Sequence, residues 1–404
     1  MQRIVVLGAG FAGLWSAISA ARKLDEFGIG PDRVEVTLVD HSAFHSIRVR
    51  NYEAELDGTR IPLDDILRPI DVRRVEAEVR DIDPARRRVI LSGGAEPLPY
   101  DRLVFALGSR LVRPPIPGLE AHAFDVDTYD AGCGLNAHIA ALAAQKPSPG
   151  QWTALVIGGG LTGIEVAAEM PGKLRAALGG AQGELRVIIA DRQPWIGSDM
   201  GAEARAVIDE ALSSLGVESR SGVSVAAIDE DGATLSTGER IDAATVVWCA
   251  GMQAHPLTGR FPVDRDRFGR VPVDDFLKIK NMTAEFAAGD VAWFPIDGSR
   301  SCVMSCQHGR PMGRFAGHNV VCDLLGLPML PLKIDWYTTI LDLGPWGAVC
   351  TTGWDRHVAT TGAAAKRTKI IINRERIYPP RSGNRREIFE AAEPVVQAPP
   401  AFFR

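Results

Sequence analysis

The sequence predicts an α/β fold with two Rossmann-like nucleotide-binding domains and a smaller, strand-rich C-terminal domain. The main observation is an internal repeat, because residues 4–13 (IVVLGAGFAG) resemble residues 154–163 (ALVIGGGLTG). Each copy is an apolar run, a glycine turn and then an alanine-rich segment with helical periodicity. Each is followed by a second strand that ends in an acid, at 34–40 and 185–191. Two βαβ units in one chain predict two nucleotide-binding lobes.

Length and composition agree with this prediction. A chain of 404 residues, 46% hydrophobic and 24% charged, has room for two or three globular domains. The formal net charge of −5 gives no reason to expect a nucleic-acid partner, and the basic clusters at 86–88 and 385–386 are flanked by acids. No apolar stretch reaches the length of a membrane span.

Cysteine usage and the N-terminus indicate a cytoplasmic protein. The six cysteines are scattered without framework spacing, which is typical of a reducing compartment. Residues 1–24 superficially resemble a signal peptide, but the glycine spacing within them has a better explanation as a nucleotide-binding turn.

In the first unit, Gly8, Gly10 and Gly13 allow a tight turn between strand and helix. A pyrophosphate can then lie close to the backbone, on the amides of the helix N-terminus. Asp40 ends the next strand, where an acceptor for a ribose hydroxyl is expected. It comes later than the usual ~20 residues, because residues 25–33 are predicted to be an inserted loop.

In the second unit, Gly158, Gly160 and Gly163 form the corresponding turn. Asp191 ends the following strand, and an acid there accepts from a free 2′-hydroxyl and repels a 2′-phosphate. NADH is therefore predicted over NADPH, with NADPH left open because Arg192 could bind that phosphate. Glu165 follows the last glycine by two residues. It is either a carboxylate favoured by the helix dipole or a group near the nicotinamide or flavin.

Between and after the two units the chain contains turns, short strands and one further helix. The proline-rich stretches 113–118 and 146–150 predict a crossover between the lobes and a loop into the second unit. A helical segment is expected at 309–325. From Pro328 onward the chain is predicted to be strand-rich, with a β-hairpin across 341–355 packed by tryptophans. The isoleucine run Ile370–Ile372 is included in that strand-rich tail.

These motifs together resemble the two-dinucleotide-binding flavoproteins, and within them the type II NADH:quinone oxidoreductases. Residues 104–109 (VFALGS) and 246–251 (VVWCAG) resemble the family's two strand ends that return under the nucleotides. Residues 286–290 (FAAGD) resemble its strongest signature, and residues 51–54 occupy the place where the family covers the flavin ring. The match is spread over about residues 1–325.

The resemblance implies that the first turn holds FAD and the second holds NADH. It divides the chain into an FAD-binding domain (1–115 and 252–325), an NAD(P)H-binding domain (116–251) and a C-terminal domain (326–404). Asp290 would hold a ribityl hydroxyl, and the backbone at Val79 would meet the adenine unless Val79 is only a buried strand valine. The implied FAD contacts are Gly8, Gly10, Ala12, Gly13, Asp40, Val79, Ala106, Gly108, Gly289, Asp290 and Gln307. The implied nicotinamide nucleotide contacts are Gly158, Gly160, Gly163, Asp191 and Gly251.

By the same resemblance, hydride passes from NADH to FAD and electrons then pass to a quinone-like acceptor. The family's Ala-Gln pair beside the flavin corresponds to Cys306-Gln307, although Gln307 could instead be a solvent-facing residue at a helix start. Catalytic roles are expected for Glu165, Gln307 and His308. His308 and His45 could relay protons or be hydrogen-bonded structural histidines. The family's C-terminal membrane anchor is not apparent in residues 398–404.

Thiol and metal chemistry are less compatible with the sequence. Disulfide reductases of this build need a cysteine pair near residues 41–55, and none is present. Cys302 and Cys306 share a face only if their segment is helical, and with His308 they are too few to bind zinc. We interpret them as structural thiols, with a redox role left open.

Several alternatives remain at this point. The acceptor could be a small metabolite, a ferredoxin or a sulfide/quinone couple, or the chain could be a flavin-based NADH sensor or interaction protein. A protein partner would need a complementary charged docking face. Peripheral contact with a membrane and a homodimer both stay open for the C-terminal domain.

Overall fold

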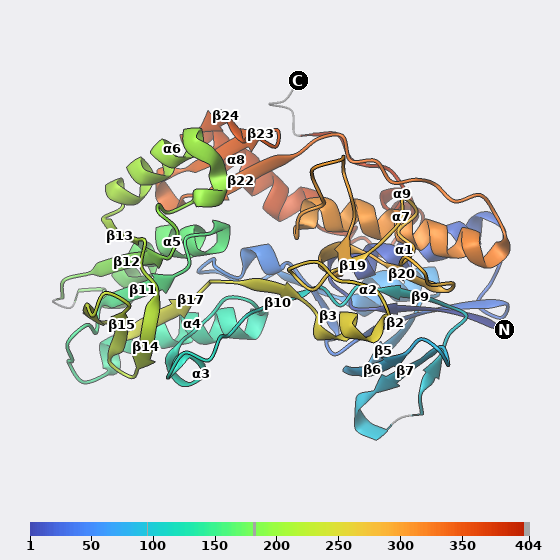
Figure 1. The fold of residues 1–404 in the computed structure, drawn as a ribbon, viewed down its shortest axis with the longest axis horizontal. Helices are drawn as coiled ribbons and strands as arrows, with labels where there is room; N and C mark the ends of the chain where they lie inside the picture. Colours follow the sequence, from blue (N-terminus) through green and yellow to red (C-terminus); the bar gives the residue numbers. More distant parts are fainter. Residues whose placement is uncertain (95, 181–182, 400–404) are drawn as a thin grey trace.

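The computed structural model describes residues 1–94, 96–180 and 183–399, which form two lobes, each built on a parallel sheet, and a C-terminal part that contacts both (Figure 1). The first sheet is five-stranded, with the order β20-β9-β1-β2-β5 and parallel pairing throughout. Its strands are β1 (Gln2–Leu7), β2 (Val34–Asp40), β5 (Arg73–Glu76), β9 (Arg102–Phe105) and β20 (Glu285–Ala287). Four successive residues of β1, Ile4 to Leu7, are fully buried, as expected of a parallel strand covered on both faces.

The second sheet repeats this topology. It is four-stranded and parallel, in the order β13-β12-β11-β17. Its strands are β11 (Thr153–Ile157), β12 (Arg186–Asp191), β13 (Val217–Ser221) and β17 (Thr245–Trp248). Strands β1 and β11 have corresponding neighbours in their sheets, since the order β9-β1-β2-β5 matches β17-β11-β12-β13. The predicted α/β class with two Rossmann-like units is therefore confirmed.

Each lobe also carries a three-stranded antiparallel sheet. In the first lobe these strands are β6 (Val79–Asp83), β7 (Arg88–Leu91) and β8 (Leu98–Pro99). In the second they are β14 (Val225–Asp229), β15 (Gly232–Leu235) and β16 (Arg240–Asp242). Shorter elements complete the lobes: β3 (Phe44–Ser46), β4 (Arg60–Pro62), α2 (Leu63–Leu67), α3 (Leu119–His122), α4 (Tyr129–Ala141), α6 (Gly201–Ser214), β19 (Val271–Pro272) and β21 (Ala292–Trp293).

A helix begins directly after each glycine turn. These helices are α1 (Phe11–Glu26) and α5 (Leu161–Leu178). Because α1 continues to Glu26, the predicted loop at 25–33 starts two residues too early; its first part is the last turn of this helix.

A third long helix, α7 (Cys306–Leu325), crosses α1 closely and begins three residues before the predicted start at 309. Its glycines permit this approach, because a Cβ on Gly313 would lie 2.3 Å from the Ala12 carbonyl oxygen and one on Gly317 would lie 2.1 Å from that of Ser16. The crossing brings the start of α7 to the first glycine turn.

The segment between the two parts of the first lobe forms the second lobe. Strands β10 (Ser109–Leu111) and β18 (Met252–Ala254) pair antiparallel where the chain leaves the first lobe and returns to it. This connection supports our proposal that 1–115 with 252–325, 116–251 and 326–404 are the domains of the protein.

The C-terminal part contains the expected hairpin, formed by β22 (Thr338–Asp342) and β23 (Ala348–Thr352), and a third strand, β24 (His357–Thr361). Figure 1 shows this small sheet above the second lobe, where β22 contacts α5 and β24 contacts α6. The later helix α9 (Arg385–Ala391) returns to the first lobe and packs on α1.

The prediction of strand for Ile370–Ile372 is wrong. These residues end helix α8 (Gly362–Ile371) and begin the π-helical turn η9 (Ile372–Arg376). The side chains of Ile370 and Ile371 are 41% and 52% exposed, so these hydrophobic residues do not belong to a buried strand. A preceding run of three alanines and a lysine favours helix instead.

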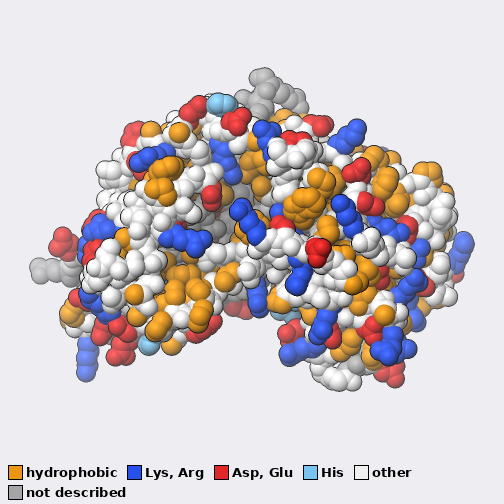
Figure 2. Space-filling model, viewed as in Figure 1, with side chains coloured by type: hydrophobic (Ala, Val, Ile, Leu, Met, Phe, Trp, Pro, Cys, Tyr) orange, Lys and Arg blue, Asp and Glu red, His pale blue; other side chains and the backbone are white. Residues whose placement is uncertain are grey.

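The face drawn in Figure 2 carries acidic and basic side chains interspersed, with hydrophobic side chains between them. Within the described residues, no helix has both the length and the apolar character needed to cross a bilayer. No membrane anchor is expected in the tail at 398–404. Its last part, residues 400–404, lies outside the described residues.

Candidate cofactor and acceptor site

A cavity of about 610 Å³ lies where the two lobes and the C-terminal part meet. Its walls include both helices that follow the glycine turns, the start of α7, strand β22, helix α8 and η9. Many of the residues predicted from the sequence line it: Gly10, Ala12, Ala106, Gly108, Gly160, Glu165, Gly251, Gly289, Asp290 and Gln307. The two repeats therefore open into one common space.

The first glycine turn has the form of a phosphate cradle. A Cβ on Gly13 would lie 1.8 Å from the Gly8 carbonyl oxygen, so only glycine lets the turn close. Gly10, in contrast, has no protein atom within 4 Å of its would-be Cβ. Helix α1 starts there without a side-chain cap and without an acid in its first turn. Its free amides and positive dipole end suit an anionic group.

The second turn repeats this geometry. A Cβ on Gly163 would lie 1.8 Å from the Gly158 carbonyl oxygen, and Gly160 faces open space. Helix α5 likewise has no side-chain cap and no acid in its first turn. The sides of the two turns that face away from the cavity are formed by Gly8, Gly13, Gly158 and Gly163, which do not line it.

The acids that end β2 and β12 bind the glycine turns. Asp40 accepts hydrogen bonds from the amides of Ala9 (2.6 Å) and Ser42 (2.8 Å). Asp191 accepts from the amides of Gly159 and Gln193 in the same way. Neither acid lines the cavity. A carboxylate has about four acceptor positions, so the predicted binding of a ribose hydroxyl by each remains a prediction compatible with these contacts.

Val79 also lies away from the cavity. It is the first residue of β6 and is buried in the core of the first lobe. The backbone contact with adenine therefore stays a prediction from the resemblance.

Asp290 lies in the cavity wall beside Gly289 and is anchored by Ser109, the last residue of the motif at 104–109, and by Arg48, which no motif identifies. Ser109 donates to its carboxylate (2.6 Å), and Arg48 in turn donates to the Ser109 hydroxyl (3.0 Å) and pairs with Asp127. Burial raises the pKa of Asp290. The side chain is thus held at a fixed position with acceptor capacity toward the cavity.

Gln307 is the second residue of α7 and also lines the cavity. Its amide nitrogen is buried and has no hydrogen-bond partner among the described residues. A buried polar group of this kind is normally satisfied, and a ligand in the cavity would supply the partner. The alternative of a solvent-facing terminal residue does not fit this burial.

The two cysteines do not share a helical face. Helix α7 begins at Cys306, and Cys302 precedes it, where it is buried and donates to the Ala292 carbonyl (3.3 Å). Burial raises the pKa of both thiols, which keeps them protonated and weakly reactive. No group of residues within the described ranges forms a metal site.

Neither histidine expected near the flavin lines the cavity. His308 is fully buried and its Nδ1 accepts from the Val303 amide (2.9 Å), while Nδ1 of His45 lies 2.7 Å from the Ala9 carbonyl oxygen. Burial lowers the pKa of each to about 4. These contacts support structural roles for both.

The buried histidines predict an acid-sensitive fold. Their folded-state pKa of about 4 lies below the unfolded value of ~6.5, so the unfolded chain binds more protons. The free energy of unfolding should therefore fall as the pH drops from about 6.5 toward 4. Urea titrations across this range test it, and His308→Gln should flatten the slope. An equal slope in wild type and variant would contradict this account.

Glu165 forms a buried ion pair that the sequence did not predict. Lys369 of α8 donates to its carboxylate (2.7 Å) and to the Ile340 carbonyl (3.1 Å), and the Asp342 amide donates to the same carboxylate oxygen (3.1 Å). Both side chains line the cavity. Burial raises the pKa of Glu165. Burial acts to lower the pKa of Lys369, but the charge and hydrogen bond of Glu165 together with the charge of Asp342 outweigh burial and raise this pKa.

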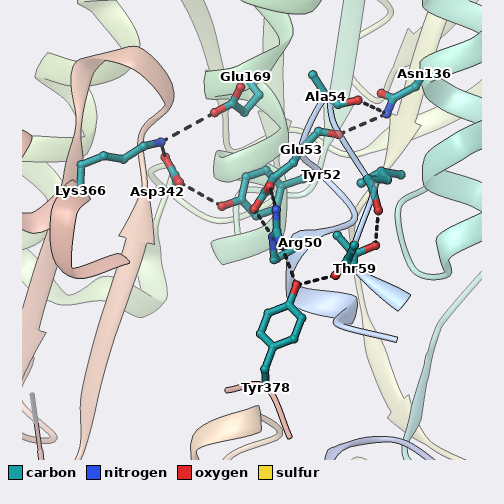
Figure 3. A network of polar contacts seen from close by, with 12 residues as sticks. Arg50, Tyr52, Glu53, Ala54, Thr59, Asn136, Glu169, Asp342, Lys366 and Tyr378 are labelled. Atoms are coloured by element: carbon teal, nitrogen blue, oxygen red, sulfur yellow. Dashed lines mark hydrogen bonds and ion pairs between the residues drawn. The ribbon is translucent and has the colours of Figure 1, made fainter. Parts of the chain in front are cut away.

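Around this pair, a polar network joins the three parts of the chain (Figure 3). Tyr52, from the loop predicted to cover the flavin, donates to Asp342 (3.0 Å), which also pairs with Lys366. In the same loop, Arg50 donates to the hydroxyl of Tyr378 (2.7 Å). Tyr52 lines the cavity. The network therefore fixes the position of this loop relative to the Glu165–Lys369 pair.

Comparisons with known proteins agree with this geometry. A family model described as pyridine nucleotide-disulphide oxidoreductase matches residues 2–313. The chain is 54% identical over 401 residues to the NADH dehydrogenase-like protein MT1860 of Mycobacterium tuberculosis, covering 99% of this chain and 100% of that protein. It is 25% identical to the type II NADH:quinone oxidoreductase of Staphylococcus haemolyticus, covering 93% and 95% of the two chains. The structure of NDH2 from Plasmodium falciparum in complex with NADH superposes with a TM-score of 0.77 at 12% identity, covering 97% of each chain.

Proposed function

This chain belongs to the pyridine nucleotide-disulphide oxidoreductase family, and we propose that it is an FAD-dependent NADH:quinone oxidoreductase. The observation that carries the proposal is the single cavity onto which both glycine turns, Gln307 and the Glu165–Lys369 pair open. In the net reaction, NADH, one proton and a quinone give NAD⁺ and the quinol.

The residues present fit two dinucleotides. FAD would lie on the first turn, with its pyrophosphate at Gly10 and its ribityl chain at Asp290, and NADH would lie on the second, with its pyrophosphate at Gly160. When bound, FAD supplies the means to accept hydride from the nicotinamide and to pass two electrons to the acceptor. Holding donor and acceptor rings in contact is worth up to ~7–11 kcal/mol of the barrier.

The protein supplies alignment and a proton route. Gln307 would donate its unpartnered amide to the flavin or to the acceptor carbonyl at the start of α7. Lys369 holds a proton at Nζ, 2.7 Å from Glu165, and both groups reach the cavity. A proton lost from Lys369 to the product can be replaced through the carboxyl of Glu165, which lies within hydrogen-bond distance of it.

Glu165→Gln is expected to slow quinone reduction by about 100-fold, the usual range for losing an acid–base group. The amide keeps the volume but carries no transferable proton, and it leaves Lys369 unpaired in a buried site. Reduction of the flavin by NADH should stay near the wild-type rate. Stopped-flow absorbance at the flavin band measures the two half-reactions separately.

Glu169→Gln is the matched control for that variant. It lies one turn further along α5, pairs with Lys366 at 3.9 Å and does not line the cavity. Its turnover should equal that of the wild type. If Glu165→Gln oxidises its flavin with quinone at the wild-type rate, Glu165 has no part in the proton route.

The electron acceptor is tested by steady-state turnover. Purified protein is expected to oxidise NADH with a soluble quinone at tens of turnovers per second, about the median for enzymes, and much more slowly with a ferredoxin. The interspersed charges in Figure 2 give no support for an extended docking face on the side shown. Turnover with ferredoxin alone would overturn the quinone proposal, and binding of NADH without any turnover would favour a sensor.

A further inference from the structure

Two buried arginines lie in the wall of the same cavity. Arg310 and Arg314 are one turn apart on α7, line the cavity and are only 6% and 2% exposed. Their guanidinium groups lie over the ring of Trp15, at 5.0 and 4.4 Å from its centroid. Arg376 of η9 lines the same part of the cavity.

The hydrogen-bond partners of these arginines within the described ranges are neutral oxygens. Arg310 donates to the side-chain oxygen of Gln397 (3.0 Å), and Arg314 reaches the Val395 carbonyl (3.5 Å). Arg376 donates to the Ala398 carbonyl. The Nε atoms of Arg310 and Arg314 are buried and have no partner among the residues that the structure describes. The charge of Glu393 acts on Arg314, but among the described residues no acid forms an ion pair with either arginine, and neither guanidinium is fully hydrogen-bonded.

Such an arrangement is costly without an anion. Burying a charge destabilises the fold unless the charge is paired. Burial lowers the pKa of Arg310 to about 9 and that of Arg314 to about 10, and at neutral pH both still carry a proton. A carboxylate or sulfonate would form charge-assisted, bidentate hydrogen bonds with these groups.

The position on α7 relates the arginines to the proposed reaction centre. Gln307, Arg310 and Arg314 have the spacing i, i+3 and i+7, which places them on one face of the helix. From Gln307 to Arg314 the helix advances by about 10 Å. A ligand of about two fused rings spans that distance. The cavity lining includes aromatic and aliphatic side chains, among them Phe11, Trp336, Ile372, Ile377 and Val396.

We propose that Arg310 and Arg314 bind an anionic substituent on the electron acceptor, so that the enzyme takes an aromatic, quinone-like acceptor that carries a carboxylate or sulfonate. This inference rests on the proposed function, because it assigns the substrate class of the same cavity. The acceptor ring lies toward Gln307, and its acidic group lies against the two guanidinium groups. A phosphate of FAD is the other anion that could reach this cluster, and the experiment separates the two.

The test uses redox-inert probes on the oxidised, FAD-loaded protein, so that it does not depend on turnover. Isothermal titration calorimetry compares 2-naphthoate with 2-naphthamide, which share the ring system and differ in charge. The wild type should bind the naphthoate at least about tenfold more tightly, as one charge-assisted contact implies. Arg314→Gln and Arg310→Gln should each remove most of that preference and leave the naphthamide affinity unchanged.

Arg386→Gln is the control, since Arg386 is an exposed arginine on α9 outside the cavity. It should keep the full preference for naphthoate. Because neither arginine forms an ion pair with an acid among the described residues, their replacement by glutamine should not lower the melting temperature. The flavin-to-protein absorbance ratio of the variants should equal that of the wild type.

Three results would overturn the inference: equal binding of the two probes by the wild type, a preference that survives both substitutions, or loss of FAD from the arginine variants. The last would assign the arginines to a cofactor phosphate. Failure of the proposed function looks different. A wild type that prefers naphthoate but fails to pass electrons from NADH to any quinone would retain the anion site and lose the quinone assignment.

Discussion

Gly10→Val is expected to yield a folded protein that binds FAD at least about tenfold more weakly, and up to ~100-fold if the methyl groups overlap the pyrophosphate. The reason is the contrast between the glycines of the first turn. Gly13 is packed against the Gly8 carbonyl, whereas Gly10 has no protein atom within 4 Å of a built Cβ and has a φ of −68°, which any residue adopts. The Cβ of a valine there has no protein atom within 4 Å, and the side chain occupies the space expected for the ligand.

The flavin-to-protein absorbance ratio after purification and dialysis measures this loss, and thermal unfolding of the apoprotein checks the fold. The cost to the fold should be that of a weaker helix cap, about 1 kcal/mol. Gly172→Ala is a control for adding a Cβ within a helix, because Gly172 in α5 also faces open space and does not line the cavity. Full FAD content in Gly10→Val would show that the first turn does not hold the pyrophosphate.

Gly160→Val is expected to keep its FAD and to lose the response to NADH. The second turn has the same geometry as the first, with Gly163 packed against the Gly158 carbonyl and Gly160 open. The apparent Kd for NADH should therefore rise by at least about tenfold. Dithionite should still bleach the flavin, because the first lobe is intact.

The two valine variants are controls for each other, because both change an open N-cap glycine of extended backbone. Titration of anaerobic flavin reduction against NADH concentration measures the effect of Gly160→Val. Loss of FAD from Gly160→Val, with retention of FAD by Gly10→Val, would reverse the assignment of the two turns.

Much of the fold follows from local sequence signals. The repeat of strand, glycine turn and helix involves residues that are close in sequence, and it predicts two nucleotide-binding lobes. The structure contains two parallel sheets with the same strand order. The tryptophan-rich hairpin was also found, and Trp354 stacks on Tyr337 with ring centroids 4.5 Å apart. The helix at Gly362–Ile371 is not predicted by the hydrophobic pattern, because Ile370 and Ile371 are hydrophobic but exposed.

Residues of the site can be predicted from the sequence only where they belong to a motif. Glycines have fixed spacings in a βαβ unit, so Gly10 and Gly160 could be found, and the resemblance of residues 286–290 to the family signature implies Asp290. Lys369 could not, since it reaches Glu165 across 204 positions of sequence from a helix that was read as strand. Arg310 and Arg314 are visible in the sequence of α7, but only the tertiary structure shows that they are buried without an ion pair to an acid among the described residues.

The most direct test of the account is an anaerobic double-mixing experiment on the FAD-loaded protein. NADH is mixed first, a soluble quinone second, and the flavin absorbance is followed through both steps. The account predicts rapid bleaching by NADH and rapid return of the colour with the quinone, each as fast as steady-state turnover. Bleaching without return of colour would contradict the quinone acceptor, and no bleaching at all would contradict the placement of NADH on the second glycine turn.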